Sequence, residues 1–170
     1  MKFVKYITED KIKNRILSIS EEVNLRFYNK NPIILCVLNG AVYFAMDLVK
    51  YFNFNYRIDF IKIKSYDHMN RGEIVCDDFD FKSLINEDVV IVEDIIDSGK
   101  TIEFIIKKLE NINIKSFTVI TLLKKNNINK IKNKVIDWYG FNIKDKYVIG
   151  YGLDINNLFR DLKDIYIKDE

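Results

Sequence analysis

Residues 89–101, Val-Val-Ile-Val-Glu-Asp-Ile-Ile-Asp-Ser-Gly-Lys-Thr, constrain the fold more than any other segment of this chain. The β-branched run at its start is typical of a central strand that is buried on both faces of a parallel sheet. This strand brings two adjacent carboxylates, Glu93 and Asp94, to its carboxyl end, where open α/β sheets bind their ligands. Apolar residues at helical spacing begin at Ile102. The segment therefore predicts a strand, a loop over residues 94–100, and a helix, as in a βαβ unit.

The turn at residues 98–101 predicts a pocket for one phosphate. Its N–H groups, the Ser98 and Thr101 hydroxyls and the positive end of the following helix all converge on one place. Glu93 and Asp94 would repel a phosphate, and they suit sugar hydroxyls or a divalent cation instead. Phosphate, hydroxyls and a metal side by side indicate a phosphorylated ribose as the ligand.

Strands and helices alternate along most of the chain. Helices are predicted at residues 8–29, with Thr8 as the cap, and at residues 41–52. Further strands are predicted at residues 33–38, 56–63, 73–76, 116–123, 135–139, 147–151 and 164–168. This order favours an α/β fold with a mainly parallel sheet flanked by helices. We expect a single domain over residues 1–170, with its core at about 30–134 and a small hood, or cap, from about 1–12 and 135–170.

Composition excludes several classes of protein. Hydrophobic residues make up 48% and charged residues 31% of the 170 residues, which excludes a disordered chain. The formal net charge of +2 gives no strong attraction to nucleic acid or to a membrane surface. The apolar run at residues 33–38 is too short to span a bilayer, and no signal peptide is expected at the start. Cys36 and Cys76 stand in apolar runs and are expected to be buried, reduced thiols of a cytoplasmic protein.

The segment at residues 89–101 resembles the ribose-phosphate motif of type I phosphoribosyltransferases, and the rest of the chain resembles their hypoxanthine/guanine branch. Four further segments carry this resemblance: the pyrophosphate loop, the start of a flexible lid, the segment of a purine-binding lysine, and the purine pocket with a second metal site. The pyrophosphate loop corresponds to residues 35–41, and the start of the lid to Ser65-Tyr66. The lysine segment corresponds to residues 122–125, and the purine pocket to residues 145–154 with 159–161.

The resemblance implies the type I phosphoribosyltransferase fold with its hood, and a glycosyltransferase reaction of purine salvage. The 5-phosphoribosyl group would pass from 5-phosphoribosyl 1-pyrophosphate to N9 of hypoxanthine, and of guanine, giving IMP or GMP and pyrophosphate. Mg²⁺ would be the cofactor. Homodimers or homotetramers are implied, with no nucleic acid and no membrane as partners.

The resemblance also implies roles on the ribose-phosphate side of the site. Glu93 and Asp94 would hold the ribose hydroxyls, partly through Mg²⁺. Asp97 would sit near purine N7 and exchange the ring proton, although a role in capping the turn is the alternative. The 5′-phosphate would be bound by Asp97, Ser98, Gly99, Lys100 and Thr101.

On the purine side, Lys125 would donate to purine O6, and the neighbouring Lys124 is the alternative. Tyr147 would stack on the base unless it is a core residue, and Val148 would offer its backbone. Asp154 would ligate a second Mg²⁺.

Pyrophosphate would be bound by Leu38, Asn39, Gly40 and Arg160. Asn39 stands where many relatives have lysine, and a cis peptide between Leu38 and Asn39 is expected. His68, the only histidine, lies in the implied lid and is expected to be a solvated loop residue.

Three other functions compete with this interpretation. A phosphoribosyltransferase for another base is disfavoured by residues 147–160, and a regulator that senses the donor or binds RNA is disfavoured by the presence of Asp97. A P-loop NTPase would need glycine at position 94, where this chain has Asp94. The sequence leaves the ranking of hypoxanthine, guanine and xanthine open.

Overall fold

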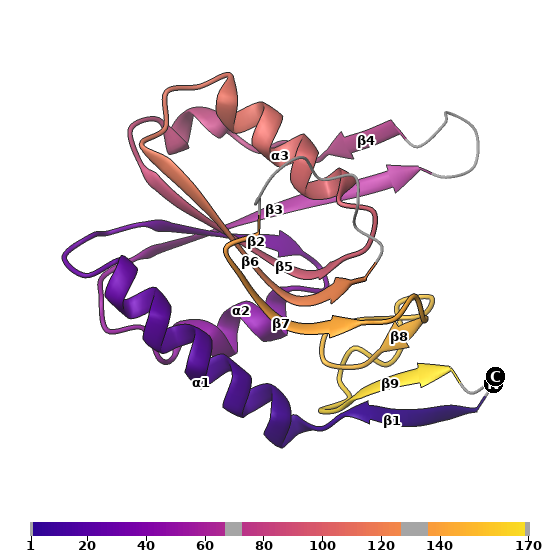
Figure 1. Ribbon diagram of the computed structural model, residues 1–170. Helices are drawn as coiled ribbons and strands as arrows, with labels where there is room; N and C mark the ends of the chain where they lie inside the picture. The colour runs from indigo at the N-terminus through magenta and orange to yellow at the C-terminus, as the bar shows by residue number, and fades with distance from the viewer. Residues whose placement is uncertain (1, 67–72, 127–135, 169–170) are drawn as a thin grey trace.

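The main body of the computed structural model is a six-stranded sheet with helices on both faces (Figure 1). The structure describes residues 2–66, 73–126 and 136–168. The helical elements are α1 (Glu9–Arg26), α2 (Val42–Val49), the short 3₁₀ helix η1 (Phe81–Leu84) and α3 (Lys100–Glu110). The strands are β1 (Phe3–Ile7), β2 (Ile33–Leu38), β3 (Arg57–Tyr66), β4 (Glu73–Cys76), β5 (Asp88–Ile96), β6 (Ser116–Lys125), β7 (Trp138–Ile143), β8 (Val148–Ile149) and β9 (Ile165–Lys168).

The large sheet has the strand order β4-β3-β2-β5-β6-β7. Strands β3, β2, β5, β6 and β7 run parallel, and β4 is added to β3 as an antiparallel edge strand. The expected α/β fold with a mainly parallel sheet is therefore confirmed. Because these parallel strands point the same way, β2, β5 and β6 all end at the same edge of the sheet (Figure 1).

The alternation of side chains along β2 separates two cores. Ile34 and Cys36 face α1 and α2, whereas Ile33, Leu35 and Val37 face α3. Helices α1 and α2 cover one face of the sheet and α3 covers the other (Figure 1). No helix in these described ranges is long and apolar enough to cross a membrane.

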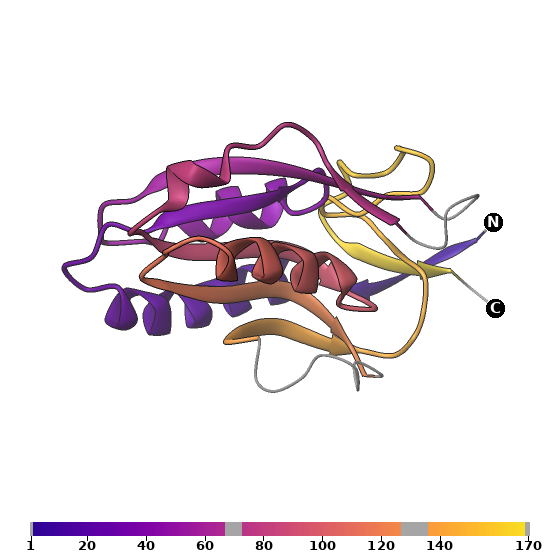
Figure 2. The same cartoon turned by 90° about the horizontal axis from the view of Figure 1, so that it is seen from above.

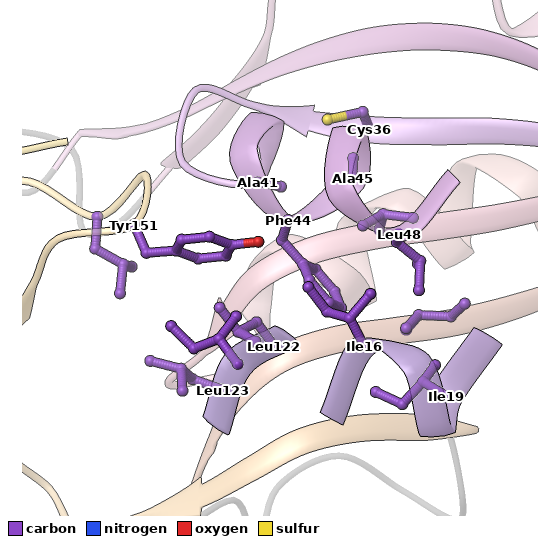
Figure 3. Packing of buried hydrophobic residues seen from close by; sticks show 14 of the residues in the cluster. Ile16, Ile19, Cys36, Ala41, Phe44, Ala45, Leu48, Leu122, Leu123 and Tyr151 are labelled. Carbon is purple, nitrogen blue, oxygen red and sulfur yellow. The ribbon is translucent and has the colours of Figure 1, made fainter. Parts of the chain in front are cut away.

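Phe44 of α2 is a central residue of the first core. Its side chain is fully buried, and its ring points toward Ile16 of α1 in Figure 3. We expect Phe44→Ala to lower the free energy of unfolding by about 3–5 kcal/mol, because the lost contacts leave a cavity. Leu25→Ala on α1 is the control, since 82% of Leu25 is exposed and the expected change is within about 0.5 kcal/mol. Denaturant unfolding of both variants measures these changes, and equal losses would contradict the assigned core.

A second sheet of three strands, in the order β1-β9-β8, forms the hood at the edge where the parallel strands end (Figure 2). It packs on the first core through Ile7, Val148, Tyr151, Leu153 and Ile165. This shared core fixes the hood over the carboxyl ends of the strands.

Beyond shifts of element ends, such as β8 at Val148–Ile149 where a strand over 147–151 was predicted, the structure differs from the sequence prediction in three features. Residues 138–143 form β7 and pair in parallel with β6, so this part of the predicted hood belongs to the large sheet. The sequence predicted this strand at residues 135–139 rather than 138–143. As an edge strand whose residues before the buried Ile143 are exposed or half-buried, β7 has no continuous apolar run to mark its bounds. Strand β1 was not expected, because the strand it pairs with, β9, lies at the other end of the sequence. The predicted loop over residues 94–100 is also wrong at its start, because β5 continues to Ile96, and Ile95 pairs with Leu123.

Candidate active site

Three segments meet at the carboxyl end of β5: the turn after β2, the end of β5 itself, and the hood loop that contains Gly152. A Cβ atom on Gly40 would lie 1.5 Å from Asp94 Oδ2, and one on Gly152 would lie 2.0 Å from the Gly40 carbonyl oxygen. At position 152 only glycine fits, because the neighbour is backbone, and a side chain at position 40 would displace the Asp94 carboxylate. The three segments are therefore in direct contact. Gly152 also has a φ of 95°, which side chains rarely adopt.

The turn after β2 contains the predicted pyrophosphate-binding residues. The peptide between Leu38 and Asn39 is cis, as expected from the sequence. Asn39 is exposed at the turn, and Gly40 is buried against Asp94. The backbone of this turn therefore borders the same space as the carboxylates of β5.

Glu93 and Asp94 form a tight carboxylate pair. Glu93 is buried, and its Oε2 atom has no hydrogen-bond partner among the residues that the structure describes. Burial, and then the charge of Asp94, raise the pKa of Glu93 well above its usual value. Burial also raises the pKa of Asp94, although hydrogen bonds and the Arg160 charge oppose this rise. The Glu93–Asp94 pair therefore has too little positive charge and too few hydrogen-bond donors around it to stabilise two ionised carboxylates.

A cavity of about 300 Å³ lies between β5 and α3, and it is lined by the predicted phosphate residues. These residues are Asp97, Ser98, Gly99, Lys100 and Thr101, together with Glu93. Gly99 caps α3 in the left-handed conformation with a φ of 80°. The N–H groups of the first turn of α3 border the cavity, and that of Lys100 donates to Ser98 Oγ at 3.5 Å. Ile74 of β4 also lines this cavity.

The residues that resemble the start of a lid, Ser65 and Tyr66, end strand β3 and pair with β4. Ser65 pairs with Ile74 and Tyr66 with Glu73. His68 lies outside the described residues, so the sequence interpretation of this histidine stays untested. The β3–β4 pair reaches the phosphate cavity through Ile74.

Lys125 at the end of β6 is held by two carboxylates. Its Nζ donates to Asp97 Oδ2 at 2.7 Å and to Asp145 Oδ1 at 2.8 Å. The neighbouring Lys124 Nζ lies instead over the ring of Tyr139, 4.3 Å from its centroid. The structure therefore brings Lys125, and not Lys124, to Asp97.

A second cavity of about 230 Å³ lies on the other side of Asp97. It is lined by Asp94, Ile95, Asp97, Lys125, Lys146, Tyr147, Val148, Leu153 and Asp154. Tyr147 is 53% exposed and its hydroxyl donates to the Asp154 carbonyl at 3.1 Å, so it is not a core residue. The structure brings all four predicted purine residues to this cavity.

Arg160 and Asp154 are paired within the hood. Arg160 Nη2 lies 2.6 Å from Asp154 Oδ1, and its Nη1 donates to the Gly152 carbonyl at 2.6 Å. The other oxygen of Asp154 accepts from the backbone N–H of Asn157 at 2.7 Å. Arg160 therefore lies against the loop that touches Gly40.

Asp145 is the residue that sequence reasoning missed. It was part of the segment that resembles the purine pocket, but no role was attached to it. Asp145 follows β7, and Lys125 ends β6. Their positions indicate a contact only once the pairing of these two strands is known.

Comparisons with known proteins agree with this geometry. The family model described as "Phosphoribosyl transferase domain" matches residues 5–156. A hypoxanthine-guanine-xanthine phosphoribosyltransferase of Tritrichomonas foetus is 36% identical over 163 residues, which cover 95% of this chain and 89% of the relative. The hypoxanthine-guanine phosphoribosyltransferase of Bacillus subtilis is 33% identical over 159 residues, covering 92% and 87%. A crystal structure of a hypoxanthine phosphoribosyltransferase from Staphylococcus aureus superposes with a TM-score of 0.90 at 29% identity, over 98% of this chain and 91% of the other.

Proposed function

The chain belongs to the phosphoribosyltransferase family, among its hypoxanthine-guanine members, and from this premise we propose that it is an enzyme of purine salvage. It transfers the 5-phosphoribosyl group from 5-phosphoribosyl 1-pyrophosphate to N9 of hypoxanthine and guanine. One observation carries this proposal. The cavity at the phosphate loop and the cavity that contains Lys125 meet at Asp97, which lines both.

In the proposed complex, the 5′-phosphate lies on the Ser98–Thr101 loop and the ribose hydroxyls face Glu93 and Asp94. The backbone of Leu38, Asn39 and Gly40, with Arg160, binds pyrophosphate. Because Asn39 carries no charge, Arg160 is the cation we assign to pyrophosphate. Its present partner, Asp154, would be released when pyrophosphate takes its place.

The residues present fit Mg²⁺. The unpartnered Glu93 Oε2 and the adjacent Asp94 carboxylate are hard oxygen donors, and Mg²⁺ combines one or two such groups with substrate oxygens and waters. Asp154 is the proposed ligand of a second ion. Mg²⁺, when bound, would offset the negative charge of the donor and of departing pyrophosphate.

The second cavity is proposed to hold the base. Tyr147 stacks on its face, the Val148 backbone contacts its edge, and Lys125 donates to O6. Asp97 accepts the ring proton at N7 as N9 bonds to the ribose carbon. These groups keep the base flat against the hood while the bond to pyrophosphate breaks.

A pyrophosphate-release assay tests this function. The purified protein receives 5-phosphoribosyl 1-pyrophosphate and Mg²⁺, with hypoxanthine, guanine, xanthine or no base. We expect release with hypoxanthine and guanine, and its loss when the metal is chelated. Release with none of the bases would reject the proposed function.

The position of the 5′-phosphate is a separate prediction. A crystal structure with IMP bound is expected to show the phosphate against the backbone of residues 98–101, because the N–H groups at the start of α3 and the helix dipole attract an anion there. A phosphate bound elsewhere would contradict the assignment of this loop.

We also propose that residues 1–170 act as one domain, in a homodimer or homotetramer in the cytoplasm. The family resemblance supports the assembly, and the buried free thiol of Cys36 fits a reducing compartment. Analytical ultracentrifugation would measure the assembly state.

A further inference from the structure

The Asp145 carboxylate has no role in the proposed function, yet it is one of two groups that hold the Lys125 ammonium. The Lys125 side chain is only 12% exposed, whereas Asp97 and Asp145 are 62% and 67% exposed. The buried partner of this network is therefore the lysine, and the two carboxylates approach it from the solvent side. Burial alone would lower the pKa of Lys125, but hydrogen bonds and charges from Asp145 and Asp97 together raise it.

An ammonium has three N–H donors, and two of them are used by Asp97 and Asp145 in the free protein. The proposed function requires Asp97 to turn toward purine N7 during the reaction. Lys125 then loses one of its two carboxylates at the step at which its ammonium must be charged and correctly aimed. Asp145 lines neither cavity, so binding of a base leaves it free to stay on Lys125.

Asp145 also connects two walls of the purine cavity. It stands in the tight turn after β7, where the Lys146 N–H donates to the Lys144 carbonyl at 2.8 Å. Lys125 pairs with Ile143 at the end of the same strand, and Tyr147 follows the turn. The contact between Asp145 and Lys125 therefore ties the lysine that faces O6 to the segment that carries the stacking ring.

From this geometry we propose that Asp145 is a positioning residue for the purine base. It holds the Lys125 ammonium in the cavity, so that one N–H faces O6 while Asp97 is released to N7. This inference rests on the proposed function and deepens it, because it names the group that keeps the O6 donor in place.

Kinetics of Asp145→Asn test this inference. Loss of a hydrogen bond to a charged group is expected to lower kcat/KM for hypoxanthine by about 10–100-fold. The KM for 5-phosphoribosyl 1-pyrophosphate should stay within about twofold, because Asp145 does not touch its proposed site. Asp145→Glu should recover part of the loss. Asp78→Asn removes the same charge from an exposed position between β4 and η1, and is expected to behave as wild type.

A double-mutant cycle with Lys125→Met separates positioning from a merely structural role. If Asp145 acts through Lys125, adding Asp145→Asn to Lys125→Met should change kcat/KM by less than about twofold. Where turnover is too slow to measure, the affinity for IMP, measured by calorimetry, is compared across the same variants. If the two substitutions lower kcat/KM independently, so that their losses multiply in the double variant, the inference is overturned. An Asp145→Asn variant equal to wild type would overturn it as well. Wild-type protein that is inactive with every base would instead reject the proposed function.

Discussion

Adenine is expected to react about 10⁴–10⁵-fold less efficiently than hypoxanthine, compared as kcat/KM, because the cavity is built around a donor to O6. The Lys125 ammonium has only donors, and O6 of hypoxanthine or guanine is an acceptor. Adenine places an amino group at the same position, so donor would face donor. Stacking on Tyr147 cannot restore the balance, since every base offers a π-face.

The contacts of Lys125 strengthen this expectation. A free lysine could swing into solvent and relieve the clash with adenine, but this one is mostly buried and held by two carboxylates. With a base bound and Asp97 turned toward N7, swinging away would still break the contact between Lys125 and Asp145. Steady-state kinetics with the two bases at the same donor and Mg²⁺ concentrations measure the ratio. Values within about tenfold of each other, a difference near 1.4 kcal/mol, would show that Lys125 does not read position 6.

Asp97→Asn is expected to lower turnover by about 10²–10⁴-fold, the usual cost of losing a positioned acid or base. Asparagine keeps the shape of aspartate and one acceptor oxygen, so a role in capping the turn would survive. Lys125 also keeps Asp145 as its partner in this variant. Nucleotide affinity and the free energy of unfolding should therefore change little.

Single-turnover rates are the measurement for Asp97, because slow product release could hide a change in the chemical step. Calorimetric titration with IMP and denaturant unfolding serve as controls on binding and folding. A single-turnover rate near that of wild type would reduce Asp97 to a structural residue of the turn.

The parts of the site that sequence predicted are contiguous in the chain. Residues 89–101 contain the strand, the carboxylates and the phosphate loop, so local patterns were enough to place Glu93, Asp94 and the Ser98–Thr101 turn at one sheet edge. Thr8 was also readable as a cap, and its hydroxyl accepts from the Lys11 N–H at 3.4 Å. Family resemblance supplied the roles of Lys125, Tyr147 and Asp154.

The parts that sequence missed depend on contacts between distant segments. The pairing of Phe3 with Lys168 has no local signature, because β1 and β9 are both short and partly exposed. Membership of β7 in the large sheet followed from its register with β6, which no residue pattern in β7 itself indicates. Asp145 was overlooked for the same reason, since its partner lies on the neighbouring strand.

The pairing of β1 with β9 also sets the order in which the enzyme can become complete during synthesis. A nascent chain leaves the ribosome from its N-terminus, and β1 must wait for β9, which is synthesised after every other described strand. The phosphate loop, between β5 and α3, needs none of these late residues. A chain stalled just after β6 would thus contain the residues of the phosphate loop but would lack both the Tyr147 wall and Arg160, the cation assigned to pyrophosphate.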